Sequence, residues 1–171
     1  NGRIIVFIEP IALYMTKDLY KAKDGKWEFI YPKLNDESPI GEFKSYGNGR
    51  LLTILTYGNG LYLSLQAQKD IEKKLGKKIK IIDLMWISDI NYETLLKEIS
   101  PCKKILIVDE CRRSGCHGEG ILTNLILKSK TSLNIDLHAA EDSFISIGNA
   151  ATATLPSKDS IVQNALNLVN A

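Results

Sequence analysis

The densest group of reactive side chains in the sequence is the stretch DECRRSGCHGEG, from Asp109 to Gly120. It joins carboxylates, guanidinium groups, thiols, an imidazole and glycines directly after the apolar run KKILIV. Three kinds of chemistry use such residues: a metal centre, a glycine-rich phosphate cradle, and a cysteine nucleophile with its base. The spacing of the residues helps to decide among them.

A metal centre in this stretch would combine Cys111, Cys116 and His117 with the distant His138. Tetrahedral sites of this kind are usually built on CxxC pairs, which this sequence does not contain. A cysteine nucleophile needs a base within hydrogen-bond reach, and a histidine directly after a cysteine usually points elsewhere. We therefore predict no metal site. A hydrolase built on Cys111 or Cys116 stays open as a third alternative.

The charged residues around these thiols have simple structural interpretations. Glu110 beside Arg112 and Arg113 is typical of an ion pair at a strand end, or of an acceptor for backbone amides. Glu141 and Asp142 lie in a polar turn and are expected to be solvated. The sequence therefore indicates no self-sufficient catalytic constellation, and we predict no catalytic, cofactor-binding or metal-binding residue in this chain.

A second candidate is the turn YGNGLYL, where Gly58 and Gly60 precede a predicted helix whose amides could face an anion. The third glycine of a GxGxxG turn is replaced by Leu63. Asp83, which would have to contact a ribose, is predicted to lie in a loop past the next strand. A tight turn from strand to helix explains the glycines equally well.

Composition limits the classes of function. The 171 residues, 44% hydrophobic and 25% charged, suffice for one core, and a net charge of +2 excludes a general nucleic-acid binder. The three cysteines fit a reducing compartment, so we expect a cytoplasmic or matrix-like location. No apolar run is long enough to span a membrane.

The start of the chain predicts a buried strand from Ile4 to Ile8, covered on both faces and ended by Glu9 and Pro10. The chain lacks an initiator Met, and we expect a fragment of a longer protein. Residues from Met15 to Pro39 are rich in charge and turn formers, which predicts a linker with one short hairpin.

Two short strands follow, at 41–46 and 51–57, and Asn48-Gly49 between them predicts a hairpin with an antiparallel edge. The rest of the chain alternates between strand and helix, which predicts a mostly parallel sheet with helices on both faces. Ligands of such sheets bind at the carboxyl ends of strands, so the loops 57–60, 83–89 and 109–120 are candidates. The alternating elements are a helix from Leu61 to Leu75 ended by Gly76, a strand from Lys78 to Ile82, a helix over Tyr92 to Ile99, a strand from Ile105 to Val108, a helix through Ile121 to Ile126, a strand from Leu133 to Leu137, and a last helix capped by Ser157 and Asp159.

An ordered set of segments resembles the tail of the beta subunit of the decarboxylating component of 2-oxo acid dehydrogenases, in the transketolase superfamily. The resemblance covers most of residues 3–127. The matching positions are Glu9, Pro10 and Tyr14, then Pro39 to Gly41, Thr56 to Gly58, Ile82 to Leu84, and Glu110, Arg113 and Gly115.

This resemblance implies a three-layer α/β fold with a mostly parallel five-stranded sheet and one antiparallel edge strand. Residues 1–38 would be the tail of a pyrimidine-binding domain plus a linker, and 39–171 a transketolase carboxyl-terminal domain. Thiamine diphosphate and magnesium would bind between other domains of the full enzyme, with no cofactor in this chain. That enzyme would decarboxylate a 2-oxo acid and pass the acyl group to lipoamide.

The implied role of this chain is assembly, with the rest of its own enzyme, a second copy and a lipoyl acyltransferase core as partners and with neither nucleic acid nor membrane. Two departures affect this expectation: Cys116 replaces a family glycine, and the segment SFISIGNAATATLPSK replaces an aromatic and proline-rich one. The alternative is a regulatory domain that binds a small or nucleotide-like ligand at the strand ends. The candidate partner-facing or ligand-facing residues are Gly58, Gly60, Asp83, Glu110, Arg112, Arg113, His117, Glu141 and Asp142.

Overall fold

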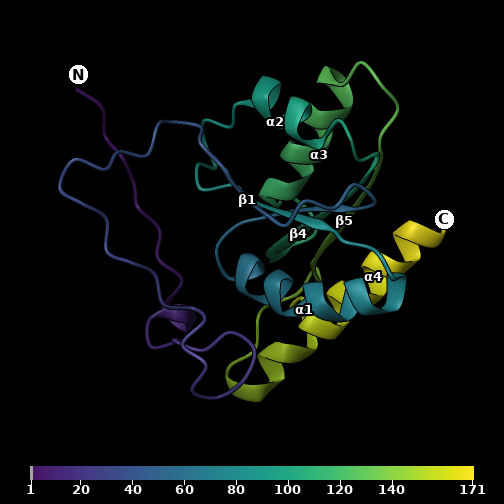
Figure 1. Cartoon of the computed structure of the whole chain (residues 1–171). Helices are drawn as coiled ribbons and strands as arrows, with labels where there is room; N and C mark the ends of the chain where they lie inside the picture. The colour runs from purple at the N-terminus through teal and green to yellow at the C-terminus, as the bar shows by residue number, and fades with distance from the viewer. Residues whose placement is uncertain (1) are drawn as a thin grey trace.

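The computed structural model describes residues 2–171 and has three layers (Figure 1). A five-stranded sheet in the order β1-β3-β2-β4-β5 lies between two pairs of helices, and all of its strand pairs are parallel except β1 with β3. The predicted fold class is thereby confirmed. The strands are β1 (Lys44–Tyr46), β2 (Thr53–Thr56), β3 (Lys80–Asp83), β4 (Lys104–Arg112) and β5 (Asn134–Ala140); the α-helices are α1 (Asn59–Leu75), α2 (Tyr92–Ile99), α3 (His117–Lys128) and α4 (Lys158–Asn170), with 3-10 turns η1 (Ile11–Leu13) and η2 (Gly148–Ala153).

The core consists of one apolar layer on each face of the sheet. Strand β4 contributes to both: Leu106 and Val108 pack toward α1 and α4, while Ile105 and Ile107 pack toward α2 and α3. Successive side chains of a strand point to opposite faces, so a run without polar residues requires cover on both sides. The apolar run KKILIV therefore indicates that this strand lies in the middle of the molecule, covered on both faces.

The predicted hairpin between the first two strands is wrong, although the antiparallel edge is present. Strand β1 pairs with β3 and not with β2. The loop containing Gly49 passes the amino end of β3, where the Gly49 amide donates a hydrogen bond to the Ile79 carbonyl at 3.3 Å. The Asn-Gly signal thus lies in a connection that reverses the direction of the chain, with bends at Arg50 and Leu51. This connection carries the chain around another strand instead of back along its own.

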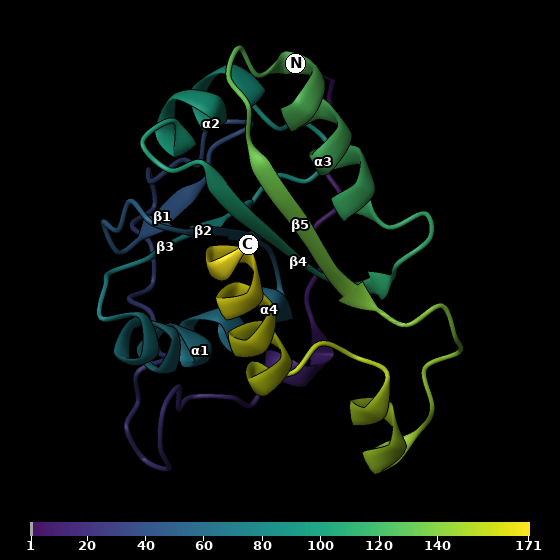
Figure 2. The same cartoon turned by 90° about the vertical axis from the view of Figure 1, so that its right-hand side faces the viewer.

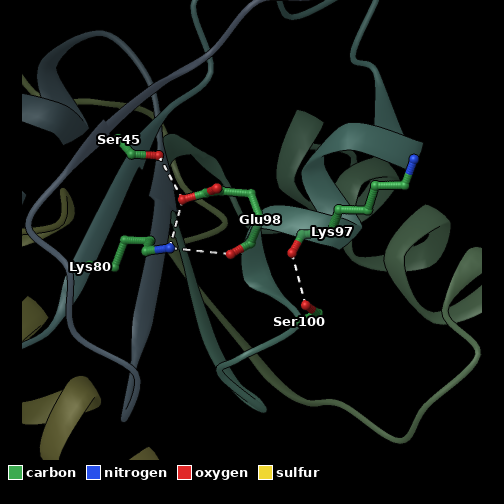
Figure 3. A network of polar contacts seen from close by, with 5 residues as sticks. All are labelled: Ser45, Lys80, Lys97, Glu98 and Ser100. Carbon is green, nitrogen blue, oxygen red and sulfur yellow. Dashed lines mark hydrogen bonds and ion pairs between the residues drawn. The ribbon is translucent and has the colours of Figure 1, made fainter.

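The edge of the sheet is tied to α2 by a partly buried network (Figure 3). The Lys80 ammonium group donates to the Glu98 carboxylate at 2.6 Å and to the Glu98 backbone carbonyl at 3.2 Å. The hydroxyl of Ser45, on β1, donates to the same carboxylate at 3.2 Å. Lys80 lowers the pKa of Glu98 despite partial burial, because it stabilises the charged form. One carboxylate therefore joins β1, β3 and α2.

The predicted strand at Ile4 to Ile8 does not form. Its side chains are exposed, for example Phe7 at 81%, and no strand of the described residues lies beside it. A buried strand needs neighbours for its backbone groups and its apolar faces, and the edges of this sheet are β1 and β5. The continuous apolar run indicates a strand, but residues 2–171 contain no strand that pairs with it.

The predicted linker is an anchored loop without a hairpin, and we call residues 17–29 the strap. Leu19, 6% exposed, enters the core beside α1, and its carbonyl accepts a hydrogen bond from Gln66 at 2.7 Å. The Trp27 ring meets the Tyr62 ring edge-on at 5.1 Å between centroids. The carboxylate of Asp24 accepts hydrogen bonds from four backbone amides of the strap. The strap therefore covers the outer face of α1.

The helix ends follow the predicted capping signals. Helix α1 ends at Gly76, whose φ of +60° is the left-handed conformation that glycine adopts most easily. The Ser157 hydroxyl accepts a hydrogen bond from the Ser160 amide at 3.1 Å, which caps α4. Several boundaries differ from the prediction, and two of them bear on the candidate residues: β4 continues to Arg112, and Asp83 is the last residue of β3 instead of part of the following loop.

Candidate functional site at the switch point of the sheet

The chain leaves β2 on one side to form β3 and then crosses to the other side to form β4. This reversal is a topological switch point, where ligands of open α/β sheets usually bind. It brings together two of the predicted loops, because Asn59 donates a hydrogen bond to Glu110 at 2.5 Å. The Thr56 hydroxyl also donates to the Val108 carbonyl at 3.0 Å. The third loop, 83–89, follows β3 on the far side of β2.

Asp109 organises this edge of the sheet. It is 1% exposed, and its two carboxylate oxygens accept from the amides of Cys111 at 2.9 Å and Gly118 at 2.8 Å. The Gly118 amide belongs to the first turn of α3, where the helix dipole favours a negative charge. This role of Asp109 was not predicted from the sequence. The available signal was an acid at the end of a buried strand, shortly before a glycine-rich helix start.

The aromatic residues at the switch point pack against one another. Burial and a hydrogen bond to Asp109 raise the pKa of Tyr57 well above its ordinary value. The Tyr57 ring meets the His117 ring edge-on, with 5.9 Å between centroids. The Nε2 atom of His117 is buried and has no hydrogen-bond partner within residues 2–171. Apart from this nitrogen, the polar side chains described above form hydrogen bonds that hold the loop in place.

The structure does not assemble the metal or nucleophile constellations considered from the sequence. Burial raises the pKa of both Cys111 and Cys116, and Asp109 raises them further, which disfavours a thiolate. His138 lies on the other face of the sheet, where its Nε2 is 2.8 Å from the hydroxyl of Ser160 on α4. Across residues 2–171, no three His, Cys, Asp or Glu side chains are grouped so that they could hold a metal ion.

The predicted ion pair of Glu110 with the following arginines is absent from the described residues. Glu110 bonds to Asn59 instead, and its pKa is raised by burial. Arg113 donates to the Leu137 carbonyl at 2.8 Å, so its guanidinium group fixes β4 to β5. The register of β4 against β5 shifts between Val108 and Arg112, and such irregularities re-aim the side chains next to them. Local twist therefore separates charges that are adjacent in sequence.

Arg112, Ser114, Asp142, Ser143 and Phe144 line an open hollow of about 390 Å³, which we call the Arg112 hollow. Each carboxylate oxygen of Asp142 accepts one hydrogen bond there, from the Ser114 amide at 2.7 Å and from the Ser114 hydroxyl at 2.6 Å. These bonds lower the pKa of Asp142, and the charge of Arg112 lowers it further. No carboxylate lies within 4 Å of the Arg112 guanidinium group in the described part of the chain.

The segment that follows this hollow exposes apolar side chains. Phe144 is 99% exposed and Ile147 is 98% exposed. Figure 2 shows the chain between β5 and α4 projecting away from the rest of the molecule. Glu141, at the start of this segment, has an exposed side chain, and its amide donates to the Thr154 carbonyl at 2.9 Å. The candidate residues Arg112, Glu141 and Asp142 therefore border one exposed surface.

The glycines of the first loop are required by packing. A Cβ atom at Gly60 would lie 2.2 Å from the Thr56 hydroxyl, and Gly58 has a φ of +55°. The first turn of α1 has no side-chain cap, and Pro10 lies 3.5 Å from the position of a Cβ atom at Gly58. The structure thus accounts for both glycines through the turn itself.

Asp83 lies apart from these residues, opposite Lys44 in the β1–β3 pair. Burial raises the pKa of Asp83 from 3.8 to about 6, although Lys44 lowers it. An acid with a higher pKa in the folded state than in the unfolded chain weakens folding as the pH rises between those two values. The contribution of Asp83 to the free energy of unfolding is therefore greatest below about pH 4, where the acid is protonated in both states. This contribution falls as the pH rises to about 6.

We expect Asp83→Asn to raise the free energy of unfolding at pH 7 by about 2 kcal/mol, after allowance for partial solvent screening. The difference from the natural chain should shrink as the pH falls toward 4. Urea unfolding at several pH values measures it, and Asp89→Asn, which changes an exposed acid in the loop after β3, is the matched control. A difference that does not change with pH would contradict this assignment.

The comparisons with known proteins agree with this architecture. The sequence model of the family described as "Transketolase, C-terminal domain" matches residues 41–155. Pyruvate dehydrogenase E1 component subunit beta of Staphylococcus aureus is 25% identical over 163 residues, which cover 94% of this chain and 47% of that protein. The subunit of the same name from Staphylococcus epidermidis is 26% identical, with the same coverage. The chain thus spans about half the length of the curated relatives it matches.

Solved structures share the fold at low sequence identity. A split-gene transketolase, described as an inactive beta4 tetramer, has a TM-score of 0.68 at 15% identity and covers 80% of this chain and 44% of its own. A 2-oxoglutarate:ferredoxin oxidoreductase from Magnetococcus marinus has a TM-score of 0.51 at 15% identity, with 75% of this chain and 20% of that chain covered. In residues 2–171, no helix is both long and apolar enough to cross a membrane.

Proposed function

Since this chain belongs to the family of transketolase carboxyl-terminal domains, we propose that it is the non-catalytic assembly domain of a thiamine diphosphate-dependent 2-oxo acid dehydrogenase. The full enzyme would decarboxylate a 2-oxo acid and transfer the acyl group to lipoamide. The observation that carries the proposal is the contrast between two surfaces. The polar groups at the switch point are largely bonded to one another, whereas the neighbouring segment 144–147 exposes Phe144 and Ile147.

We propose that the residues of this chain do not hold the magnesium-bound cofactor. Magnesium takes oxygen ligands in octahedral geometry, and beside a diphosphate it needs at least one carboxylate that is free to bind it. Asp109, the most buried carboxylate, already accepts from backbone amides. We therefore assign no step of the reaction to this chain, and we place the cofactor of the full enzyme in its other domains.

The proposed partners are a second copy of the chain and a lipoyl acyltransferase core. Exposed aromatic and aliphatic side chains beside an arginine are typical of the centres of protein interfaces. Segment 144–147 supplies the apolar part and Arg112 the charge. The three cysteines, none of which forms a disulfide, support a reducing compartment such as the cytoplasm.

Self-association of the purified chain tests the assembly role. We expect a concentration-dependent mass in sedimentation equilibrium, and we expect the double variant Phe144→Asp with Ile147→Asp to weaken association by at least about tenfold. Leu127→Asp is the control, because Leu127 is 78% exposed on α3, outside this surface. A mass that stays monomeric at all concentrations, or equal effects of the double variant and the control, would count against the proposal.

Calorimetry with thiamine diphosphate and magnesium tests the non-catalytic part of the proposal separately. No binding heat is expected from the chain alone. Tight binding would show that the chain carries cofactor-binding residues of its own, and the assembly-only role would then be wrong.

Binding of a small anionic ligand is the second candidate function, favoured by the unpaired guanidinium group in the Arg112 hollow. Arg112→Gln tests it, since the side chain is exposed and its loss leaves the core intact. Gly60→Val is unsuitable for this purpose because it would collide with Thr56. Nucleotide binding that Arg112→Gln abolishes would favour this second function over assembly.

A further inference from the structure

A second hollow lies at the opposite end of α1. It has a volume of about 410 Å³ and lies at the amino edge of the sheet, because α1 starts after the carboxyl end of β2 and ends before β3. The Arg112 hollow lies at the carboxyl edge. The two surfaces are therefore independent. The residues that line this second hollow, which we call the lysine hollow, are Lys69, Glu72, Lys73, Gly76, Lys77 and Lys78.

The single carboxylate of the lysine hollow is already saturated. Glu72 accepts from the Lys78 ammonium group at 2.6 Å, from the Ile79 amide at 3.2 Å and from Gln68 at 3.1 Å. Its side chain is 14% exposed. Burial alone would raise the pKa of Glu72, but these three bonds lower it. Glu72 and Lys78 thus neutralise one another, and Glu72 is not available to pair with the other lining lysines.

Three ammonium groups remain without a carboxylate partner. Lys69, Lys73 and Lys77 have no acidic oxygen within 4 Å in the part of the chain that the structure describes. Lys69 lies over the Tyr20 ring of the strap, 3.2 Å from its centroid. The helix dipole favours a cation in the last turn of α1, which accounts for Lys73. The dipole does not explain why three ammonium groups line the same hollow, because like charges one helical turn apart repel one another.

We propose that the lysine hollow binds an acidic segment of a partner protein, with two or more carboxylates spaced by one helical turn. Lys69 and Lys73 are four residues apart on α1, so their side chains emerge about 6 Å apart on one face. A pair of carboxylates at the same spacing on a partner helix would meet both. A single small anion would leave one ammonium group unpaired. This inference goes beyond the assembly role and uses a different surface.

The chemistry of the hollow favours acidic protein over nucleic acid or membrane. Single-stranded nucleic acids bind where bases can stack on free aromatic rings, and Tyr20, the ring in contact with this surface, is already covered by Lys69. A membrane surface would need apolar side chains beside the lysines, and the lining residues are charged apart from Gly76.

The test is fluorescence anisotropy of the full chain with a labelled helical peptide that carries glutamate pairs four residues apart. We expect saturable binding at low salt. Replacement of both Lys73 and Lys77 with Gln should weaken binding about tenfold, as the loss of two partly exposed charge pairs implies. The matched control replaces Lys33 and Lys103, exposed lysines outside the hollow, and should change the affinity less than about twofold.

Three results would overturn the proposal: no binding of the peptide at low salt, equal effects of the two double variants, or equally strong competition by an oligothymidine of the same charge. Thermal melts of both variants should coincide with that of the natural chain, because the replaced side chains are exposed. Loss of self-association in the variants of segment 144–147 would leave peptide binding unchanged, so failure of this inference and failure of the assembly role are distinguishable.

Discussion

Gly49→Ala should cost at least about 3 kcal/mol of unfolding free energy or prevent folding, because no space exists for its Cβ atom. That atom would lie 2.1 Å from the Lys78 carbonyl oxygen and 2.4 Å from the Ile79 Cα atom. Both neighbours are backbone atoms at the start of β3 and cannot move aside as a side chain would. Urea denaturation followed by circular dichroism measures the loss.

Gly120→Ala is the matched control for this substitution. Gly120 is exposed inside α3, and nothing lies within 4 Å of the position of its Cβ atom. Alanine in an exposed helix interior is more favourable than glycine by about 0.5–1 kcal/mol, so this variant should be slightly more stable. A Gly49→Ala variant as stable as the natural chain would show that the loop after β1 does not pass close to β3.

The close approach at Gly49 explains why the first pairing was predicted wrongly. Local sequence specifies where the chain can reverse, and Asn48-Gly49 does lie in such a reversal, next to Gly47 at a φ of +77°. The partner of a strand, however, depends on what else competes for its edge. Strand β3 pairs with β2 in parallel and with β1 in antiparallel orientation, so it occupies the position that a hairpin would need. That competition involves residues more than thirty positions away and leaves no local pattern.

The central strands and the helices were predictable because their signals are local and repeated. Strand β4 is apolar on both faces, and helix α1 combines helical spacing of leucines with a glycine stop at Gly76. The strand expected at Ile4 to Ile8 has an equally clear pattern, yet a pattern states only which surfaces need cover. Whether other residues cover those surfaces depends on the rest of the polypeptide. Among the described residues, no strand pairs with Ile4 to Ile8, and their side chains are exposed.

The candidate site was predictable in position but not in its bonds. The order of elements indicated that the loops after β2 and β4 would be eligible, and the structure brings Asn59 and Glu110 into contact. The expected ion pair of Glu110 with Arg112 or Arg113 failed because the strand irregularity after Val108 turns these side chains in different directions. The side chains of neighbouring residues on a regular strand point to opposite faces of the sheet. A bulge changes these directions, and no sequence pattern in this stretch indicates the bulge.

Asp109→Ala should lower the unfolding free energy by about 2–3 kcal/mol, because it leaves the partly buried amide of Cys111 and the buried amide of Gly118 without their acceptor. Asp109→Asn keeps one acceptor oxygen but turns an amide group toward donors, and should cost about half as much. Asp142→Ala is the matched control: Asp142 accepts the same kinds of bond from Ser114 at an exposed position, where water replaces it at a cost below about 1 kcal/mol.

Guanidinium unfolding of the three variants, with self-association measured in parallel, separates a structural role for Asp109 from a chemical one. If the reactive stretch exists to hold the start of α3 against β4, both Asp109 variants should keep their association constants in proportion to the fraction folded. Equal stabilities of Asp109→Ala and Asp142→Ala would contradict that interpretation. The carboxylate of Asp109, which is 1% exposed, would then serve a role other than fixing the loop. Asp109 and the neighbouring His117, whose Nε2 atom is buried, would be the first residues to test for ligand binding.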